Sequence, residues 1–386
     1  MTKKNIAFIN LVPHVGALPA LISSVSYLSE IGYTIDFVTV KYANHIPEPK
    51  FNNLNVNEIF LPSIHLSRKV VPSIFVKYYQ SFKLLKLRGP YLCIFGVDQA
   101  GMTLSVPISL MLNTRVIYFP MELYLSGEIT GIIQRIYKSI ERIFNKRTKM
   151  TIIQDDLRAK LLTKDNNISS KQIVVVPNSA LGLATHKRGC YFNEKYGIPR
   201  DKIIILSAGN IIGWAMSYEL AESALSWPEK YVLVLHGYVQ DNQHMYLEKI
   251  KNLVAKSKSI IFSLDMVPYE DLDYMHSSVD IGVALYNPQE HIRTTDFENI
   301  GLSSGKLMRY LKAGLPVITS NLPNLRKLID EYKCGICVNH PSEIINAINK
   351  LSTNHAKYSQ NSIAAYDGEF EFSRHFAEVV KRVRNW

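Results

Sequence analysis

The sequence predicts an α/β protein made of two doubly wound domains, each with a parallel sheet covered by helices. Short apolar, β-branched runs alternate with helical patterns along the whole chain, which is typical of parallel strands joined by crossover helices. A chain of 386 residues is too long for one ordinary core and suits two domains. An irregular stretch with Gly182, Gly189 and Pro199 separates two series of strands and provides a linker.

The first domain is expected to span residues 1–180. Its first strand, Asn5–Leu11, leads into a loop with His14 and Gly16 and then into a helix over residues 18–31, which has apolar residues on one face. The remaining strands are predicted at Thr34–Val40, Tyr91–Phe95, Arg115–Tyr118, Met150–Ile153 and Gln172–Val176.

The second domain is expected to span residues 181–368. A helix at residues 369–386 should cross back to the first domain. Ligands of open parallel sheets bind beyond the carboxyl ends of the strands, so two such Rossmann-like domains should face each other across a ligand-binding cleft. The strands of this domain are predicted at Lys202–Leu206, Lys230–Leu235, Ser259–Ser263, Asp280–Ala284, Pro316–Thr319 and Ile336–Val338.

Residues 303–318 predict an anion site. Ser303, Ser304 and Gly305 form a small-residue loop, Lys306 lies in the first turn of a short amphipathic helix, and a buried strand follows. Backbone N–H groups at a helix N-terminus are unpaired and lie at the positive end of the helix dipole. With a lysine added, a diphosphate is the natural ligand.

The excess positive charge lies in the first half of the chain. Residues 1–180 hold 21 Lys and Arg against 11 Asp and Glu, whereas residues 181–386 hold 23 against 22. The segment Arg68–Arg88 is basic, aromatic and amphipathic, and is expected to contact an anionic membrane surface. The alternative is a core helix with a solvated basic face. No nucleic-acid reader motif accompanies the charge, so no nucleic-acid partner is expected.

The composition favours a cytoplasmic protein, peripheral to the membrane at most. Four scattered cysteines do not make a disulfide framework. Cys334 and Cys337 have metal-site spacing, but a turn into a short strand explains them better because further zinc ligands are missing. No apolar run is long enough for a transmembrane helix.

Four segments have a characteristic order and spacing. They are Pro177-Asn178, the loop Ser207-Ala208-Gly209-Asn210, Val267–Leu272 followed by Val279–Gly282, and Lys306–Ile318, which ends in a Gly-x-Pro-Val strand entry. Together they resemble the GT-B fold of nucleotide-sugar-dependent glycosyltransferases, in particular the large retaining group called family four or group one. The resemblance covers essentially the whole chain and is strongest in the second domain.

The resemblance implies a nucleotide-sugar site in the second domain. Backbone groups near Met266 and Val267 would meet the base. Gly209 and Asn210 would line the first loop of the domain, and Ser303, Ser304, Gly305 and Lys306 would hold the diphosphate.

The paired-Glu motif of that group is altered here. The glutamate that accepts hydrogen bonds from ribose falls on Arg309, and the earlier glutamate falls on Gly301, with Glu298 as the nearest substitute. An Arg or Lys common after the first strand is also absent from residues 210–214. Arg309 is expected to serve the diphosphate instead, because a guanidinium pairs well with phosphate oxygens.

Three first-domain residues are candidates for the chemistry because each follows a strand: His14, Asp98 and Glu122. One of the two carboxylates would act as base, unless they are ordinary helix-start or loop acids and His14 a structural loop histidine. Gly16, His291 and Arg293 are expected near the acceptor or donor sugar, although the latter two lie in a segment that would also suit a surface loop. No metal motif or cofactor motif is present, so neither is expected.

These observations predict a hexosyltransferase-type enzyme that moves a sugar from a nucleotide donor in the second domain to a glycan or lipid-linked acceptor in the first, in surface polysaccharide or glycolipid biosynthesis. Two alternatives share the fold. One is a sugar-nucleotide epimerase or hydrolase, and the other is a non-catalytic subunit that partners a transferase.

Overall fold

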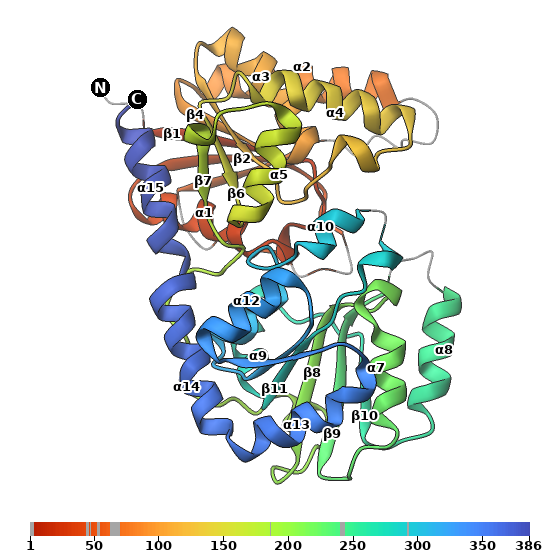
Figure 1. The fold of residues 1–386 in the computed structure, drawn as a ribbon. Helices are drawn as coiled ribbons and strands as arrows, with labels where there is room; N and C mark the ends of the chain where they lie inside the picture. The colour runs from red at the N-terminus through yellow and green to blue at the C-terminus, as the bar shows by residue number, and fades with distance from the viewer. Residues whose placement is uncertain are drawn as a thin grey trace. The chain divides into compact units, whose positions relative to one another are not determined.

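The computed structural model describes residues 4–43, 46, 48–51, 55–61, 70–185, 187–239, 244–291 and 293–386, without the side chains of residues 70–74 and 244. The chain forms two compact units (Figure 1). The first comprises most of residues 1–181 together with Phe372–Trp386, and the second comprises Gly182–Glu371. Arg68 and Lys69, at the start of the basic segment, lie outside the described residues.

The first unit contains a seven-stranded sheet in the order β3-β2-β1-β4-β5-β6-β7, and all neighbouring strands are parallel. The order reverses between β1 and β4, so the loops after these two strands flank the switch point of the sheet. The strands are β1 (Asn5–Ile9), β2 (Thr34–Val40), β3 (Val56–Leu61), β4 (Tyr91–Val97), β5 (Arg115–Phe119), β6 (Met150–Ile153) and β7 (Ile173–Val175).

The sequence did not predict β3, because this edge strand lacks a continuous apolar run. Asn57 and Glu58 interrupt it, and both are used by neighbours. The Asn57 amide donates to Asp36 Oδ1 at 2.9 Å, and the Tyr42 hydroxyl donates to Glu58 Oε1 at 2.5 Å. An edge strand needs to bury only part of its surface.

Helices cover both faces of this sheet. The right-handed crossovers place α2, α3, α4 and α5 on one face, where each contacts the next, and α1 with α15 on the other. The C-terminal helix is held there by aromatic packing, since the Phe376 ring lies 5.9 Å from Tyr27 and 6.5 Å from Phe95. The helices are α1 (Pro19–Glu30), α2 (Val70–Arg88), α3 (Asp98–Leu112), α4 (Ile132–Asn145), α5 (Asp156–Asn166) and α15 (Phe372–Arg384).

The second unit contains a six-stranded sheet in the order β10-β9-β8-β11-β12-β13, also parallel throughout. Its switch point lies between β8 and β11. Its strands are β8 (Ile203–Asn210), β9 (Tyr231–Tyr238), β10 (Ile260–Ser263), β11 (Ile281–Ala284), β12 (Val317–Ser320) and β13 (Gly335–Val338).

The expectation of a loop at Ser207–Asn210 was wrong, because these residues complete β8. Gly209 pairs with Gly237 of β9, and a Cβ on Gly237 would lie only 1.8 Å from the Gly209 carbonyl oxygen. The two glycines therefore let the strands stay paired to their carboxyl ends, and the loop begins at Ile211.

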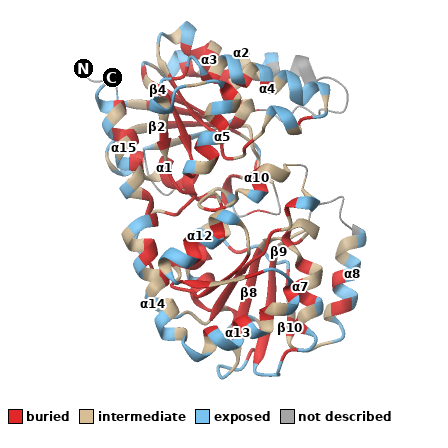
Figure 2. Cartoon of the chain, viewed as in Figure 1, coloured by how far each residue is buried: buried red, intermediate tan, exposed pale blue. Residues whose placement is uncertain are grey.

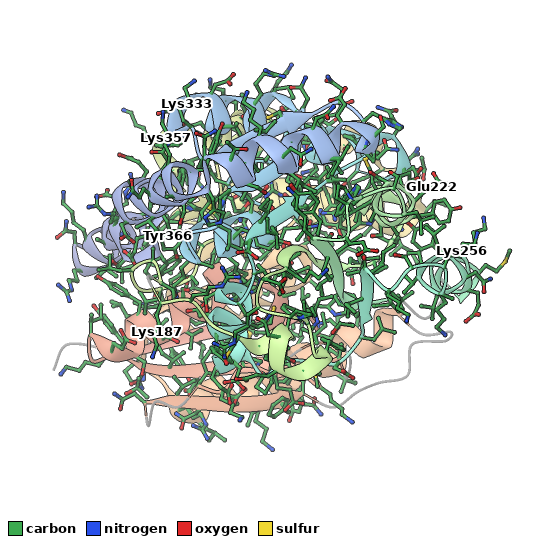
Figure 3. The ribbon with its side chains drawn as sticks, turned by 90° about the horizontal axis from the view of Figure 1, so that it is seen from below. Lys187, Glu222, Lys256, Lys333, Lys357 and Tyr366 are labelled. Atoms are coloured by element: carbon green, nitrogen blue, oxygen red, sulfur yellow. The ribbon has the colours of Figure 1, made fainter. Side chains whose placement is uncertain are left out.

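Helices surround the second sheet, and its central strands β8, β9, β11 and β12 are mostly buried (Figure 2). Seen from below, Glu222, Lys256, Lys333 and Lys357 point outward, whereas Tyr366 lies inside (Figure 3). The helices are α6 (Tyr191–Tyr196), α7 (Ser217–Ala224), α8 (His244–Val254), α9 (Leu272–Ser277), α10 (Thr294–Glu298), α11 (Gly305–Lys312), α12 (Pro323–Tyr332), α13 (Ile344–Thr353) and α14 (His355–Ala365).

Polar contacts hold both ends of the second unit together. The Gly182 N–H donates to Glu371 Oε1 at 2.9 Å, and the Ala184 N–H donates to Asp367 Oδ1 at 2.6 Å. None of the helices described is both long and apolar enough to cross a bilayer.

Candidate functional site

One side chain of α11, that of Tyr310, forms hydrogen bonds to both strands at the switch point of the second sheet. The Tyr310 hydroxyl accepts from the Ala208 N–H of β8 at 2.8 Å and donates to the Val283 carbonyl of β11 at 3.3 Å. A Cβ on Gly282 would lie 2.5 Å from the Tyr310 ring, so the glycine makes room for it. These contacts fix α11 against the two strands whose loops should hold a ligand.

The N-terminus of α11 has the geometry of an anion site. Ser304 is the N-cap, and its Oγ accepts from the Leu307 N–H at 3.2 Å and lies 2.5 Å from the Tyr286 hydroxyl. Its hydroxyl is therefore used in holding the helix start. The N–H groups of Gly305 and Lys306 make no hydrogen bond within the described part of the chain. Both donors are therefore available to a ligand at the N-terminal end of the helix.

Lys306 lies in an aromatic setting rather than beside a carboxylate. Its Nζ is 5.0 Å from the ring centre of Tyr286 and 5.7 Å from that of Trp214, and it forms no ion pair with any described residue. Burial lowers the pKa of the Lys306 ammonium to about 8. A cation that is desolvated and lacks an acidic partner is suited to an anionic ligand.

The two rings come from the loops after β8 and β11. Trp214 and Tyr286 are nearly parallel, 6.2 Å apart, and the Asn287 N–H donates to the Trp214 carbonyl at 2.7 Å. Phe297 of α10 packs on both rings. The switch point thus carries an aromatic cluster directly beside the lysine.

Arg309 is held on another side of α11. Its guanidinium lies 4.9 Å from the Tyr269 ring, and its Nη1 is 3.7 Å from Asp273 Oδ1, while Lys312 Nζ is 2.7 Å from the other carboxylate oxygen. Burial disfavours the charged Asp273 carboxylate, but Lys312 and Arg309 outweigh it and hold its pKa below the usual value. The buried Nη2 of Arg309 has no hydrogen-bond partner among the described residues.

The loop after β11 brings His291 and Arg293 to the same aromatic cluster. The His291 ring stacks on Phe297 at 3.8 Å, and the Arg293 guanidinium lies 5.7 Å from the same ring. Arg293 Nη1 also pairs with Asp296 Oδ2 at 3.3 Å. Both side chains are therefore packed against the aromatic cluster and do not form an independent surface loop.

The other expected donor-side residues differ in exposure. Val267 is buried in the core, whereas Met266 is half exposed, so the segment after β10 can present its backbone and one side chain. Asn210 ends β8, and its Oδ1 is a buried acceptor without a hydrogen-bond partner among the described residues. Glu298 is exposed and accepts from Gln289 at 3.4 Å.

Position 301 explains why the earlier glutamate of the paired motif is replaced. Gly301 is buried against α12, and a Cβ there would lie 2.8 Å from Asn324 Cβ. The Asn324 amide donates to the Asn299 carbonyl at 2.7 Å, which holds α12 close to the segment that carries Gly301. A larger side chain at position 301 would force α12 and the loop apart.

In the first unit, His14, Gly16 and Asp98 lie in the segments that follow β1 and β4, on the two sides of that sheet's switch point. His14 precedes the 3₁₀ turn Val15–Ala17, in which Gly16 is buried. Asp98 is the first residue of α3, directly after β4, and Glu122 follows β5, the next strand along. The sheet therefore brings the three candidate side chains to one edge.

Asp98 is firmly held and organises the loop that carries Glu122. It is buried, has a left-handed φ of 52°, and its Oδ1 accepts from the N–H groups of Met121 at 2.7 Å and Glu122 at 3.1 Å. A non-glycine residue in this backbone region is strained unless its surroundings stabilise it. The two hydrogen bonds supply that stabilisation.

The Pro177-Asn178 pair has a visible structural role. Asn178 Oδ1 accepts from the Ala20 N–H in the first turn of α1 at 3.1 Å, so the end of the first unit caps this helix. Nearby, the Ser23 hydroxyl donates to the Ser179 carbonyl at 3.3 Å and accepts from the Leu181 N–H at 2.9 Å.

Sequence reasoning missed the aromatic partners of Lys306 and one nearby acid. Tyr286 and Trp214 lie 20 or more positions from Lys306 in the chain, so no local pattern links them. Glu290 reaches back to the loop after β8, where its carboxylate would lie 2.2 Å from a Cβ on Gly213. The sequence showed only that these residues follow two predicted strands, and the structure shows that these strands, β8 and β11, are neighbours.

No group of three or more metal-ligating side chains was found among the residues that the structure describes. Cys334 is buried, and burial raises the pKa of its thiol to about 12. Cys337 Sγ lies 3.4 Å from the Thr319 hydroxyl of the neighbouring strand. Cys337 is thus part of β13, and Cys334 packs in the segment that leads into this strand.

Two parallel α/β units in one chain, each with its loops at a switch point, are the architecture of the GT-B fold, which the chain has. The structure of Anabaena Alr3699/HepE in complex with UDP and glucose superposes with a TM-score of 0.74, covering 99% of this chain and 100% of that one at 12% identity. WaaG, a glycosyltransferase involved in lipopolysaccharide biosynthesis, superposes with a TM-score of 0.70 at 15% identity, over 99% of this chain and 100% of its own.

Sequence comparison points the same way. Residues 274–378 match the family model Gtf3_C, the glucosyltransferase 3-like C-terminal domain. The Escherichia coli O-antigen biosynthesis glycosyltransferase WclY is 23% identical over 186 residues, which are 48% of this chain and 47% of WclY. The matched part thus spans about half the length of that curated relative. The expected resemblance to GT-B glycosyltransferases is confirmed.

Proposed function

We propose that the protein is a hexosyltransferase that moves a sugar from a nucleoside-diphosphate sugar, held by the second unit, to a glycan or lipid-linked acceptor, held by the first. The observation that carries the proposal is Lys306 at the start of α11, beside a switch point and without an acidic partner among the described residues. The reaction would belong to surface polysaccharide or glycolipid biosynthesis at the cytoplasmic face of the membrane. The relatives, which include O-antigen and lipopolysaccharide glycosyltransferases, support this setting.

UDP-glucose is the proposed donor. HepE was solved with UDP and glucose, and the matching family model is named for a glucosyltransferase. The N–H groups of Gly305 and Lys306 would bind the diphosphate, and the Lys306 ammonium would neutralise the charge that develops on it as the bond to the sugar breaks. At the end of β8, the buried Oδ1 of Asn210 is a further acceptor available to a hydroxyl of the donor.

In the first unit we propose a division of roles between the two carboxylates. Asp98 is committed to two backbone N–H groups, so it would act as a positioning residue for the Glu122 loop. Glu122 or His14 would then contact the acceptor hydroxyl. Gly16 would let the acceptor approach the loop after β1, and His291 and Arg293 would contact the donor sugar from the corner beside Trp214.

Thermal-shift measurements with UDP-, GDP-, CMP- and dTDP-sugars test the donor site. We expect UDP-glucose to raise the melting temperature of the wild-type protein and to have no effect on Lys306→Ala. The matched control is Lys251→Ala on α8, where the lysine forms an exposed pair with Glu248. The absence of a shift with every donor would point to a non-catalytic subunit, and sugar-nucleotide turnover without acceptor would point to an epimerase or hydrolase.

We further propose a peripheral contact of α2 with an anionic membrane, as the segment Arg68–Arg88 suggests. In its described part, Phe75, Tyr79, Lys83 and Lys86 are exposed. Arg88 instead forms an ion pair with the buried Asp36 carboxylate at 3.2 Å. It is left unchanged in the test variant, because replacing it would leave that carboxylate without its ion-pair partner. Sedimentation with anionic liposomes should fall in Lys83→Gln/Lys86→Gln, and an unchanged bound fraction would exclude this contact.

A further inference from the structure

Helix α4 packs on its sheet with the apolar side outward. A helix that covers a sheet normally buries its apolar stripe. At about 100° per residue, the five isoleucines of α4 fall within an arc of about 100°. Four of them are exposed: Ile132 at 76%, Ile133 at 52%, Ile136 at 55% and Ile143 at 57%. The buried residues of this helix are instead Lys138, Glu141 and Asn145.

The inward polar side is locked by a network of buried charges. Lys138 Nζ lies 2.7 Å from Asp165 Oδ2, 2.8 Å from Asn166 Oδ1 and 3.2 Å from Glu141 Oε1. Burial disfavours the charged Asp165 carboxylate, but Lys138 outweighs it and keeps its pKa below the usual value. Turning the helix to bury the isoleucines would break these contacts and leave Asp165 and Asn166 of α5 without their partners on α4. The outward apolar side is therefore a fixed feature of the fold.

Helices α2 and α3, which lie on the same face of the first sheet as α4, also expose apolar residues. Helices α2, α3 and α4 lie side by side there (Figure 1). The end of α3 exposes Leu110 and Met111, and the Tyr78 hydroxyl of α2 lies 2.9 Å from Met111 Sδ, which joins α2 to α3. We call the exposed apolar residues of these three helices the α2–α4 surface.

Cations border this surface. Arg135 and Arg142 lie on one flank of α4, and the residues that follow the helix are also basic. The single acid in α4 is Glu141, which is buried and paired with Lys138. An apolar strip with a basic rim matches the interface of a bilayer that contains anionic lipid. A second copy of the chain is a poorer match, because its own basic rim would repel this one.

We propose that α4 is a membrane-docking helix, which inserts Ile132, Ile136 and Ile143 into the headgroup region of an anionic bilayer while its flanking arginines contact lipid phosphates. The proposal extends the membrane contact suggested for α2 and does not depend on the transfer reaction. Because crossover helices begin at the carboxyl edge of a parallel sheet, α4 starts at the edge that carries Asp98 and Glu122. A lipid-linked acceptor in the same bilayer would have its head group at that edge.

Sedimentation of the full chain with phosphatidylcholine vesicles that contain phosphatidylglycerol tests the proposal. The triple variant Ile132→Gln/Ile136→Gln/Ile143→Gln should bind at least about tenfold less than wild type, because three exposed apolar side chains no longer leave water. The matched control is Met245→Gln on α8 in the second unit, which removes an equally exposed apolar residue and should bind as wild type does. Pure phosphatidylcholine vesicles should bind the wild-type protein less, because the basic rim then has no partner.

A second variant that should keep membrane binding distinguishes a lost contact from misfolding of the triple variant. Ile136→Trp should keep or strengthen binding, and its fluorescence should shift to the blue when anionic vesicles are added. The proposal is overturned if the triple variant sediments with vesicles as wild type does, or if its main effect is to turn a dimer into a monomer in sedimentation velocity. The UDP-glucose thermal shift of the triple variant should be unchanged, so failure of the donor site and failure of membrane docking are separate outcomes.

Discussion

The protonation of Lys306 should couple donor binding to pH. In the ligand-free protein, burial lowers the pKa of this ammonium from 10.5 to about 8, a desolvation cost of about 3 kcal/mol for the charged form. A bound diphosphate supplies the missing negative charge and returns the pKa toward its usual value. Binding above pH 8 therefore requires uptake of a proton.

The size of the effect follows from linkage. Below pH 8 Lys306 is charged in both states and the affinity for UDP is flat. At pH 9 only about a tenth of the free protein carries the charge, so the affinity should be about tenfold lower than at pH 7. Isothermal titration calorimetry in two buffers with different ionisation enthalpies should report uptake of about half a proton at pH 8.

Two variants make the measurement decisive. Lys306→Arg keeps a cation that does not titrate in this range, so its UDP affinity should be flat from pH 7 to pH 9. Lys306→Ala should bind UDP weakly at every pH. If the wild-type affinity falls no more steeply than that of Lys306→Arg, the lysine does not contact the diphosphate and the anion-site reasoning is refuted.

The remaining predictions concern stability and positioning. Burial lowers the pKa of His236 to about 4 and that of His276 to about 3, so the unfolded chain binds protons first as pH falls below about 6.5. Urea denaturation should show a loss of about 3 kcal/mol per histidine by pH 4, and replacing either one by Gln should flatten the profile. Tyr310→Phe leaves the Ala208 N–H without its acceptor and should cost about 1–3 kcal/mol in the free energy of unfolding, whereas a neutral result would mean that the hydroxyl does not stitch β8 to β11. Asp98→Ala should lower kcat through a disordered Glu122 loop, and Asp98→Asn, which can still accept the two N–H groups, should retain most of the activity; equal losses in both would favour a direct role for the carboxylate.

The features that sequence reasoning predicted well depend on neighbouring residues in the chain. The strands Thr34–Val40 and Met150–Ile153 have the bounds that their apolar, β-branched runs predicted. Ser304 and Gly305 begin a helix as small capping residues do, and Lys306 lies in its first turn. Propensity, periodicity and capping act over a few residues, so they are legible in the sequence alone.

Some local expectations were wrong because a neighbouring strand changed the outcome. Gly209 belongs to β8 because Gly237 lies opposite it without a side chain. The edge strand β3 forms although Asn57 and Glu58 break its apolar run, because β2 pairs with it. Asp36 also accepts a hydrogen bond from Asn57, and Tyr42 donates one to Glu58.

The sequence by itself determined the alternation of strands and helices, the two-domain α/β organisation and the position of a lysine at the start of a helix. Only the tertiary structure decided what that lysine meets, which is two aromatic rings, and that Arg309 pairs with Asp273. It also decided that α4 turns its isoleucines outward, since the buried partners of Lys138 come from α5 and from α4 itself. Burial and pairing energies depend on groups brought together from distant parts of the chain, and a one-dimensional pattern does not contain their distances.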